Sequence, residues 1–276
     1  MDDLRGANAI VTGASRGIGV YIARALAKEG VNLALAARST AELEAVRAEM
    51  EALGVKAIAV KCDVVDPADR AELIRRAEAE LGQIDLLVNN AGIERVARFD
   101  TARETDITDT LHINLEAPML LSRAIVPGML ARGRGHVVNI ASGAGKVGVA
   151  YGTSYCASKH GLVGFTNALR SEYHGSPVGF SVVCPGFVTD AGMYDRWDKK
   201  GIRAPKIAGT SKPEKVAAVV VKCIKKNKAE VTVNTPPVRP LIVLANIAPS
   251  IVPGMLKRLG YSKVFERVME SEGAGS

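Results

Sequence analysis

The sequence has few of the residues on which disulfides and metal sites depend. The cysteines are scattered and form no CxxC pair: Cys62, Cys156, Cys184 and Cys223. The histidines never stand at the spacing of metal ligands: His112, His136, His160 and His174. We therefore predict a protein of the reducing cytoplasm, without disulfides or a metal site, in which the histidines are structural.

The sequence also lacks a secretory leader and an aromatic-rich basic tract. The start of the chain, MDDLRGANAIVTG, has acidic residues and no basic region followed by an apolar core, so we expect no secretion. Aromatic residues make up 4% of the chain and do not alternate with the basic ones, which argues against a nucleic-acid partner. The net charge of +7 is uneven, since residues 196–276 alone carry +10. Such a surface suits an anionic membrane or no partner at all.

Short apolar runs alternate with helical patterns along the 276 residues. The apolar runs, each bounded by turn residues, predict strands at 7–13, 31–38, 56–63, 84–92, 135–142, 178–186 and 230–234. The clearest helical periodicity between them predicts helices at 17–29, 40–53, 67–81 and 213–226. Strands rich in Val, Ile, Leu and Ala are buried on both faces. We therefore predict an α/β fold, a doubly wound parallel sheet of the Rossmann type, with a ligand crevice at the carboxyl ends of the strands.

A glycine-rich turn, TGASRGIG, follows the first predicted strand and opens a helix. Gly13, Gly17 and Gly19 would let the backbone approach a pyrophosphate, with the helix N-terminus directed at its negative charge. The spacing is G-x3-G-x-G and not the commoner G-x-G-x-x-G. Strand, turn and helix in this order predict a dinucleotide site.

The end of the second predicted strand indicates which dinucleotide is bound. An NAD-selective site would have Asp or Glu there, but this chain has Ala36, Ala37 and Arg38. Arg16 comes from the turn itself, and two arginines suit the 2′-phosphate of NADP(H). The alternative is that both are solvated surface arginines.

Seven motifs follow one another along the chain in a fixed order. TGASRGIG comes first and NNAG stands at 89–92; the others contain Asp63 (CDV), Asn114 (HINLEAP), Ser142 (NIASGAG), Tyr155 with Lys159 (YCASK), and Pro185, Gly186 and Thr189 (CPGFVT). Together they resemble one family, the short-chain dehydrogenases/reductases, over about residues 6–235. The resemblance implies cofactor contacts from Gly13, Ser15, Arg16, Gly17, Ile18, Gly19, Arg38, Asp63, Val64, Asn90, Ala91, Gly92, Tyr155, Lys159, Pro185, Gly186, Val188 and Thr189.

The stretch YGTSYCASK has two tyrosines, and the resemblance implies that Tyr155 is catalytic, because it lies thirteen residues after Ser142 and four before Lys159. On one continuous helix Tyr151, Tyr155 and Lys159 would share a face. Free phenol has a pKa of about 10, and we expect the Lys159 ammonium and the nicotinamide ring to lower the pKa of Tyr155 toward working pH. Cys156 lies off this face, and we interpret it as packing.

The resemblance also implies a division of roles in the reaction. In reduction Tyr155 gives a proton to the carbonyl oxygen as NADPH delivers hydride, and Ser142 holds the same oxygen. Lys159 also bridges the nicotinamide ribose. Asn114 would anchor a water that returns the proton through the lysine; the alternative is a buried asparagine that satisfies a helix irregularity.

The segment after Thr189 is predicted to be a lid over the substrate, at about 189–210 and within a domain at 1–235. Met193, Tyr194 and Trp197 are its candidate contacts, and Tyr151 is expected to line the same pocket. Their apolar character suggests a hydrophobic substrate.

A C-terminal extension, 236–276, goes beyond the family pattern. Residues 241–256 carry no charge and are followed by Lys257, Arg258 and Lys263. Pro249 and Pro253 interrupt this apolar stretch, which is too short to span a membrane. Two interpretations stay open: peripheral membrane contact through 241–263, or a wall of the pocket or a subunit contact.

These features predict an NADP(H)-dependent oxidoreductase that interconverts a carbonyl and an alcohol on a hydrophobic substrate: lipid, steroid-like or long-chain. The alternative is a non-catalytic NADP(H)-binding sensor on the same fold, although such a protein would be expected to lose Tyr155 or Lys159. The resemblance further implies a homo-oligomer, a dimer or tetramer, built on the helices that carry Asn114 and Tyr155.

Overall fold

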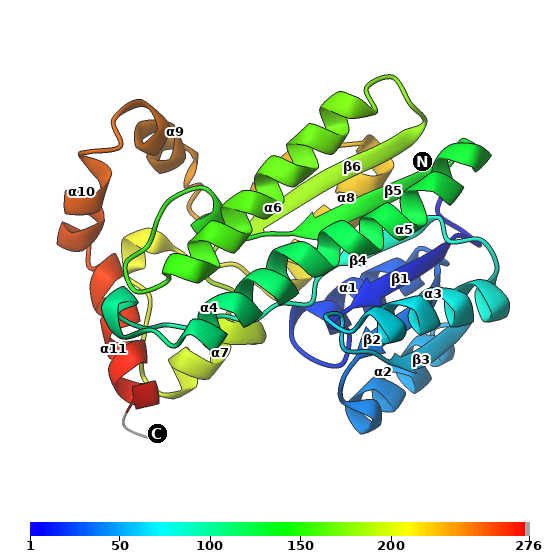
Figure 1. Ribbon diagram of the computed structural model, residues 1–276, viewed down its shortest axis with the longest axis horizontal. Helices are drawn as coiled ribbons and strands as arrows, with labels where there is room; N and C mark the ends of the chain where they lie inside the picture. The colour runs from blue at the N-terminus through cyan, green and yellow to red at the C-terminus, as the bar shows by residue number, and fades with distance from the viewer. Residues whose placement is uncertain (274–276) are drawn as a thin grey trace.

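The computed structural model describes residues 1–273, so the last three residues of the predicted extension lie outside it. In this part of the chain a seven-stranded sheet has the order β3-β2-β1-β4-β5-β6-β7, and every neighbouring pair is parallel (Figure 1). The strands are β1 Asn8–Thr12, β2 Asn32–Ala37, β3 Ala57–Lys61, β4 Leu86–Asn89, β5 Gly135–Ile140, β6 Val178–Pro185 and β7 Glu230–Val233. The predicted doubly wound parallel sheet is confirmed.

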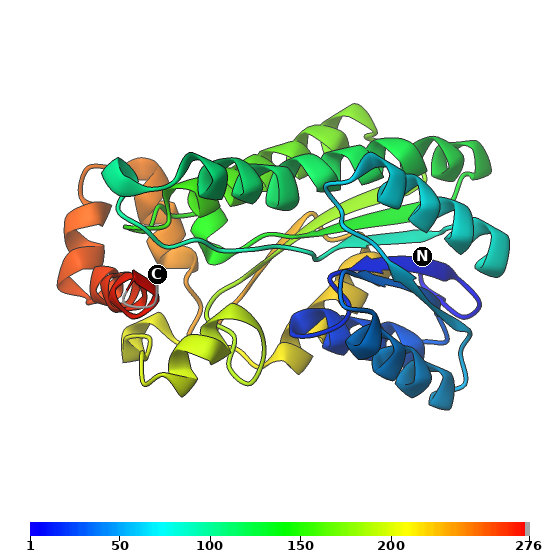
Figure 2. The ribbon, with the colours of Figure 1, turned by 60° about the horizontal axis from the view of Figure 1, so that its bottom comes forward.

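Helices cover both faces of the sheet. The longer ones are α1 Ile18–Lys28, α2 Thr40–Ala52, α3 Pro67–Leu81, α5 Ala117–Arg132, α6 Thr153–Glu172 and α8 Pro213–Lys226. Figure 2 shows α3, α5 and α6 on one side of the strands and α1, α2 and α8 on the other. Because both faces are covered, every residue of β1, β4, β5 and β6 is buried, as their content of Val, Ile, Leu and Ala predicted.

Local signals in the sequence explain where several helices begin and end. Asp66 caps α3, since its carboxylate accepts from the backbone N–H groups of Ala68 (2.7 Å) and Asp69 (3.2 Å), and Pro67 follows at the first helical position. Asn227 ends α8 in the left-handed region, with φ of 44°. The four helices that periodicity predicted are confirmed to within one residue at each end.

The winding of the chain creates the crevice in which a ligand binds. β1 lies between β2 and β4, so the chain proceeds from β1 first toward one edge of the sheet and then toward the other. Parallel strands place their carboxyl ends at one edge, where the loops that follow β1 and β4 diverge. Residues 13, 63, 90, 142 and 186 all lie just beyond a strand at this edge.

Short elements connect this frame and extend it. They are η1 Phe99–Thr101, α4 Glu104–Leu111, the π-helical turn η2 His112–Glu116, η3 Gly143–Gly145, α7 Gly192–Lys199 and η4 Lys206–Ala208. Beyond β7 follow α9 Arg239–Ile247, α10 Val252–Arg258 and α11 Tyr261–Gly273. In both views these last helices form the end of the molecule beyond the carboxyl ends of the strands. None of the helices in residues 1–273 has the length and apolar character needed to cross a membrane.

The core beneath α5 gives a direct test of the packing. Phe180 of β6 is 1% exposed and stacks on Tyr173 with ring centroids 5.5 Å apart. Phe180→Ala should lower the free energy of unfolding by about 3–5 kcal/mol, because it leaves a cavity in close-packed surroundings. Phe99 is 68% exposed, so Phe99→Ala should change the free energy by no more than about 0.5 kcal/mol. Urea denaturation of both variants measures the difference, and equal effects would contradict this packing.

Candidate active site

A cavity of about 950 Å³ opens over the carboxyl ends of the strands and continues toward the C-terminal helices. It brings together most of the residues that the sequence predicted for the site: Gly13, Ser15, Arg16, Gly17, Ile18, Arg38, Asp63, Val64, Asn90, Ala91, Gly92, Ser142, Tyr155, Lys159, Pro185, Gly186, Val188, Met193, Tyr194 and Trp197. Four predicted residues do not line it: Gly19, Asn114, Tyr151 and Thr189.

The glycine turn between β1 and α1 is tightly packed against the end of β4. Gly13 and Gly17 both have φ of 64°, in the left-handed region that favours glycine. A Cβ on Gly19 would lie 2.2 Å from the Gly13 carbonyl oxygen, which explains why Gly19 supports the turn from behind without lining the cavity. The Asn90 amide donates to the carbonyls of Thr12 (2.9 Å) and Gly13 (3.1 Å), so the loop after β4 holds the turn in place.

The turn and the end of β2 present positive charge to one end of the cavity. No side chain caps the N-terminus of α1, so its first backbone N–H groups keep their capacity to bind an anion. Arg16 and Arg38 are both exposed and line the cavity. Neither arginine is in an ion pair with another residue of the described chain, and no carboxylate follows Ala37 at the end of β2. This end of the cavity suits a phosphate more than a free ribose hydroxyl.

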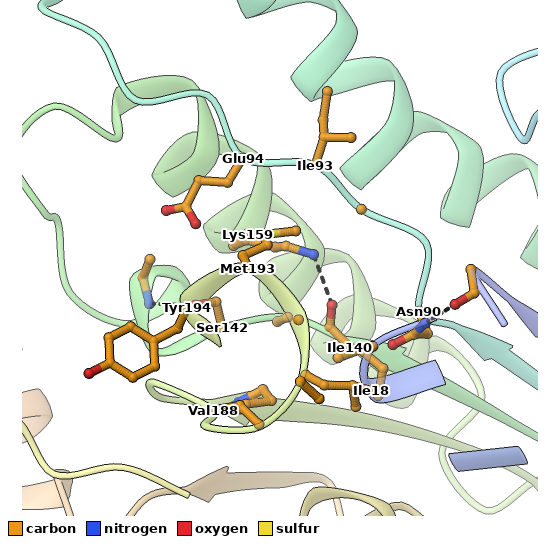
Figure 3. A pocket seen from close by; sticks show the side chains of 18 of the residues that line it. Ile18, Asn90, Ile93, Glu94, Ile140, Ser142, Lys159, Val188, Met193 and Tyr194 are labelled. Carbon is orange, nitrogen blue, oxygen red and sulfur yellow. Dashed lines mark hydrogen bonds between the residues drawn. The ribbon is translucent and has the colours of Figure 1, made fainter. Parts of the chain in front are cut away.

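Ser142, Tyr155 and Lys159 all line this cavity, and Figure 3 shows Ser142 and Lys159 within it. Ser142 follows β5, while Tyr155 and Lys159 lie one turn apart on α6, and they are 7% and 3% exposed. The Lys159 ammonium donates to the Ile140 carbonyl at 2.9 Å, and its Nζ lies 5.7 Å from the centre of the Tyr155 ring. A hydroxyl, a phenol and an ammonium therefore face one small volume.

Comparison with known proteins agrees with this geometry. Residues 7–201 match the short chain dehydrogenase family. The chain is 42% identical to the ketoacyl reductase HetN of Nostoc sp. (strain PCC 7120) over 265 residues, which are 94% of this chain and 91% of that protein. It is 38% identical to the oxidoreductase UcpA of Escherichia coli (strain K12) over 189 residues, 68% of this chain and 72% of that protein.

This chain is a short-chain dehydrogenase. Among solved structures it is similar to a variant of the actinorhodin polyketide ketoreductase with NADPH, with a TM-score of 0.75 and 32% identity over 83% of this chain and 95% of that chain. The match to HetN covers 94% of this chain and therefore includes part of the C-terminal extension. The chain is thus an oxidoreductase of carbonyl and alcohol groups, as the sequence predicted.

Tyr151 of this short-chain dehydrogenase lies outside the helix that carries the other two residues. α6 begins at Thr153, and Tyr151 has φ of 66°, in the left-handed region. The expectation of three side chains on one helix face is therefore wrong; only Tyr155 and Lys159 share it. The Tyr151 side chain packs against a buried cluster around Trp197, and its carbonyl accepts from the Ala97 N–H at 3.0 Å.

Asn114 lies behind the cavity, in the π-helical turn η2, and is fully buried. Its amide oxygen accepts from the Ile93 N–H (2.8 Å), and its amide nitrogen donates to the Ile93 carbonyl (2.8 Å) and to Ser158 Oγ (3.2 Å). The side chain thus ties the loop after β4 to α6. The π-helical turn is the helix irregularity that a buried, structural asparagine was expected to satisfy. The role of Asn114 as a water anchor stays a prediction.

Burial dominates the electrostatics of Tyr155 and Lys159. Burial, and next the charge of Glu94, raise the pKa of Tyr155 well above its usual value, while a hydrogen bond with Ser142 acts in the opposite direction. Burial also lowers the pKa of Lys159 to about 8. The protein groups alone therefore do not lower the pKa of Tyr155 as the sequence predicted, because desolvation of the phenolate exceeds the favourable interactions. Burial likewise raises the pKa of the Cys156 thiol, which fits packing and not nucleophilic chemistry.

Glu94 is a cavity residue that the sequence analysis missed. It stands two residues after NNAG and lines the same space as Lys159 and Met193 (Figure 3). Its carboxylate raises the pKa of both Tyr155 and Lys159. Its position shortly after the NNAG motif could have indicated this, because the loops that follow the strands line the crevice.

The lid and the C-terminal extension close the far end of the cavity. Trp197 of α7 meets Phe265 of α11 edge to face, with ring centroids 5.7 Å apart. The Tyr194 hydroxyl accepts a hydrogen bond from the Ala204 N–H at 2.9 Å. This bond ties α7 to the segment of the lid that follows it. The extension adds cavity residues that the sequence did not single out: Val238, Leu241, Ile242, Leu256, Tyr261 and Phe265. The extension was expected either to contact a membrane or to form a pocket wall or a subunit contact. The structure shows that it forms a wall of the cavity.

Glu94 should control the pH dependence of this short-chain dehydrogenase. With Tyr155 as the predicted acid and base, alcohol oxidation would need its deprotonated form, and Glu94→Gln removes a charge that raises the pKa of that phenol and of Lys159. The rising limb of kcat/KM against pH should therefore move to lower pH, by roughly half a unit. Glu94→Asp keeps the charge and serves as the control. A shift to higher pH, or the same shift in both variants, would contradict this electrostatic role.

Proposed function

We propose that this chain reduces hydrophobic carbonyl compounds with NADPH, and that ketoacyl chains are the substrates it fits best. The observation that carries the proposal is one continuous cavity, which joins a phosphate-binding turn, a Ser142-Tyr155-Lys159 site and an apolar wall. The names of the relatives, ketoacyl reductase and polyketide ketoreductase, support the same substrate class.

The residues present fit an NADP(H) molecule. Gly13, in the left-handed region, lets the turn pack directly on the Ala91 backbone, which a Cβ would approach to 2.8 Å, and so keeps the tight turn that a pyrophosphate needs. Arg16 and Arg38 would hold the 2′-phosphate, and Asp63 with Val64 line the cavity beyond β3, where an adenine would lie. Pro185, Gly186 and Val188, after β6, would contact the nicotinamide end, and Thr189 stays a predicted contact beside them. When bound, NADPH supplies the hydride.

The protein's part in the reaction is the placement and transfer of a proton. Ser142 and Tyr155 would both hydrogen-bond the carbonyl oxygen, and Tyr155 would donate its proton as that oxygen becomes an alkoxide. A phenol with a raised pKa is fully protonated at neutral pH, as reduction requires. Lys159, with a pKa of about 8, exchanges a proton readily near neutral pH and suits a relay that restores the phenol. Asn114 is proposed to hold the water that completes this relay.

The apolar end of the cavity supports a long or bulky substrate. Met193, Tyr194 and Trp197 line it from the lid, and the extension lines it from the opposite side with leucine, isoleucine and aromatic side chains. Burial of each methylene of a substrate chain in such surroundings contributes about 0.8 kcal/mol. Affinity should therefore rise with chain length.

We also propose that the enzyme is a cytoplasmic homo-oligomer, dimer or tetramer, that pairs through α5 and α6. All four cysteines are free and buried, which suits a reducing compartment. The outer face of α6 has small exposed residues, Gly164 and Ala168, with open space at Gly164. Met119 of α5 is 41% exposed. Small residues and an exposed methionine suit close packing of helices between subunits.

The substrate proposal is tested by NADPH oxidation against a graded series of 3-ketoacyl thioesters, from short to long chain, with steroid-like ketones beside it. The chain-length slope of kcat/KM should be positive, and NADH should be a poor donor because it leaves Arg16 and Arg38 unpaired. A flat or falling slope would contradict the apolar wall as the substrate site. NADPH binding without turnover of any ketone or of the matching alcohols would favour the sensor.

Tyr155→Phe tests the proton donor. Removing one hydroxyl should lower kcat by at least about 100-fold, because general acid catalysis contributes that much or more. NADPH affinity, measured by fluorescence, should be unchanged. Tyr173→Phe, at the opposite end of α6, removes the same atom and should retain full activity. Equal activity of the two variants would rule out Tyr155 as the acid.

A further inference from the structure

The outer face of the C-terminal helices carries an uncovered apolar stripe. Val243 is 55% exposed, Ile247 76% and Ile251 59%. They stand four residues apart, so Val243 and Ile247 share one face of α9 and Ile251 follows directly before α10. We call these three residues the outer stripe. Eight large apolar residues are exposed in the described chain, and the three of the outer stripe lie within nine positions of one another.

The inner faces of the same helices are already in use. Leu241 and Ile242 pack on a cluster around Val147 and Leu256, and they line the cavity. The outer stripe is therefore not a loosely packed core, because the core-facing positions of α9 are filled by other side chains. Figures 1 and 2 show α9 and α10 at one end of the molecule with no other element outside them.

Along the sequence, the charged residues next to the outer stripe all have one sign. Arg239 stands four residues before Val243, and Arg258 stands seven residues after Ile251, so a cation marks each end. Lys257 is exposed as well, and none of these three cations is in an ion pair within residues 1–273. Residues 231–265 contain no Asp or Glu at all.

We infer that the outer stripe docks this enzyme on an anionic lipid surface, with α9 and α10 lying in the interface. Apolar side chains on one face with Arg and Lys beside them are what an interfacial helix needs. Each cation near an anionic surface adds to the attraction, and salt weakens it.

A second copy of the chain suits this face less well. In a symmetric dimer the same patch meets itself, so Arg239 and Arg258 of one copy would approach those of the other. With no carboxylate in 231–265, nothing in the patch would neutralise them. A bilayer with anionic headgroups supplies both the apolar phase and the missing negative charge.

Docking would also place the cavity wall next to the lipid. Leu241 and Ile242 line the cavity from α9, one or two positions away from Val243. An apolar ketone dissolved in the bilayer could then reach the cavity between these helices; this delivery step, unlike docking itself, rests on the proposed function.

Vesicle flotation of the full chain tests docking without any turnover. The protein should float with vesicles of phosphatidylcholine and 30% phosphatidylglycerol at low salt, float less at 0.5 M NaCl, and stay behind with pure phosphatidylcholine. Ile247→Glu should reduce the partition coefficient about tenfold or more. Leu53→Glu changes an exposed apolar residue (41%) at the end of α2 and should float like the wild type.

Three results would overturn the inference. These are no flotation of the wild type on the anionic vesicles, equal flotation on neutral ones, or flotation unaffected by Ile247→Glu. Sedimentation of the same variants distinguishes the rival: if Ile247→Glu breaks an oligomer and leaves lipid binding intact, the stripe is a subunit interface. Ile247→Glu should retain turnover of a short water-soluble ketone, which shows that it folds. Flotation without turnover of any ketone would refute the proposed function and leave docking standing.

Discussion

The site depends on how closely α6 approaches the loop that follows β5. A Cβ on Gly145 would lie 2.6 Å from the Lys159 carbonyl oxygen, so only a glycine permits this contact. The approach buries Lys159, directs its ammonium to the Ile140 carbonyl at 2.9 Å, and brings Tyr155 to Ser142. Burial then sets the chemistry, because it raises the pKa of the phenol and lowers that of the ammonium. The burial of both side chains and the direction of both pKa shifts therefore follow from this close approach.

The two ends of the cavity are built by different parts of the chain. The carboxyl edge of the parallel sheet supplies the glycine turn, the arginines and the reacting groups, a frame that serves many activities. The lid and the extension supply the apolar end, and the edge-to-face contact of Trp197 with Phe265 joins them. Under the proposed function, substrate specificity would therefore depend on segments outside the sheet. The same extension turns an apolar stripe outward, so one segment forms both a pocket wall and an exposed surface.

Sequence alone could predict what local rules determine. Buried parallel strands, periodic helices and the glycine turn have signatures within a few residues, and the predicted strands and helices are confirmed. Sequence alone could not predict contacts between residues that are far apart in the chain. The left-handed conformation of Tyr151 ends the predicted helix face, and the pairing of Asn114 with the Ile93 backbone spans 21 positions. The pKa of Tyr155 depends on burial by the whole fold. For residues 241–256, apolar on several faces, periodicity could not decide which face turns inward.

The central claim is that one cavity holds the nicotinamide end of NADPH at Tyr155 and an apolar chain along the lid and the extension. A crystal structure with NADP⁺ and a long-chain 3-hydroxyacyl thioester tests it most directly. We predict the hydroxyl oxygen within hydrogen-bond distance of Tyr155 and Ser142, and the acyl chain against Trp197, Leu256 and Phe265. An acyl chain bound away from these side chains, or a hydroxyl out of reach of Tyr155, would contradict the account.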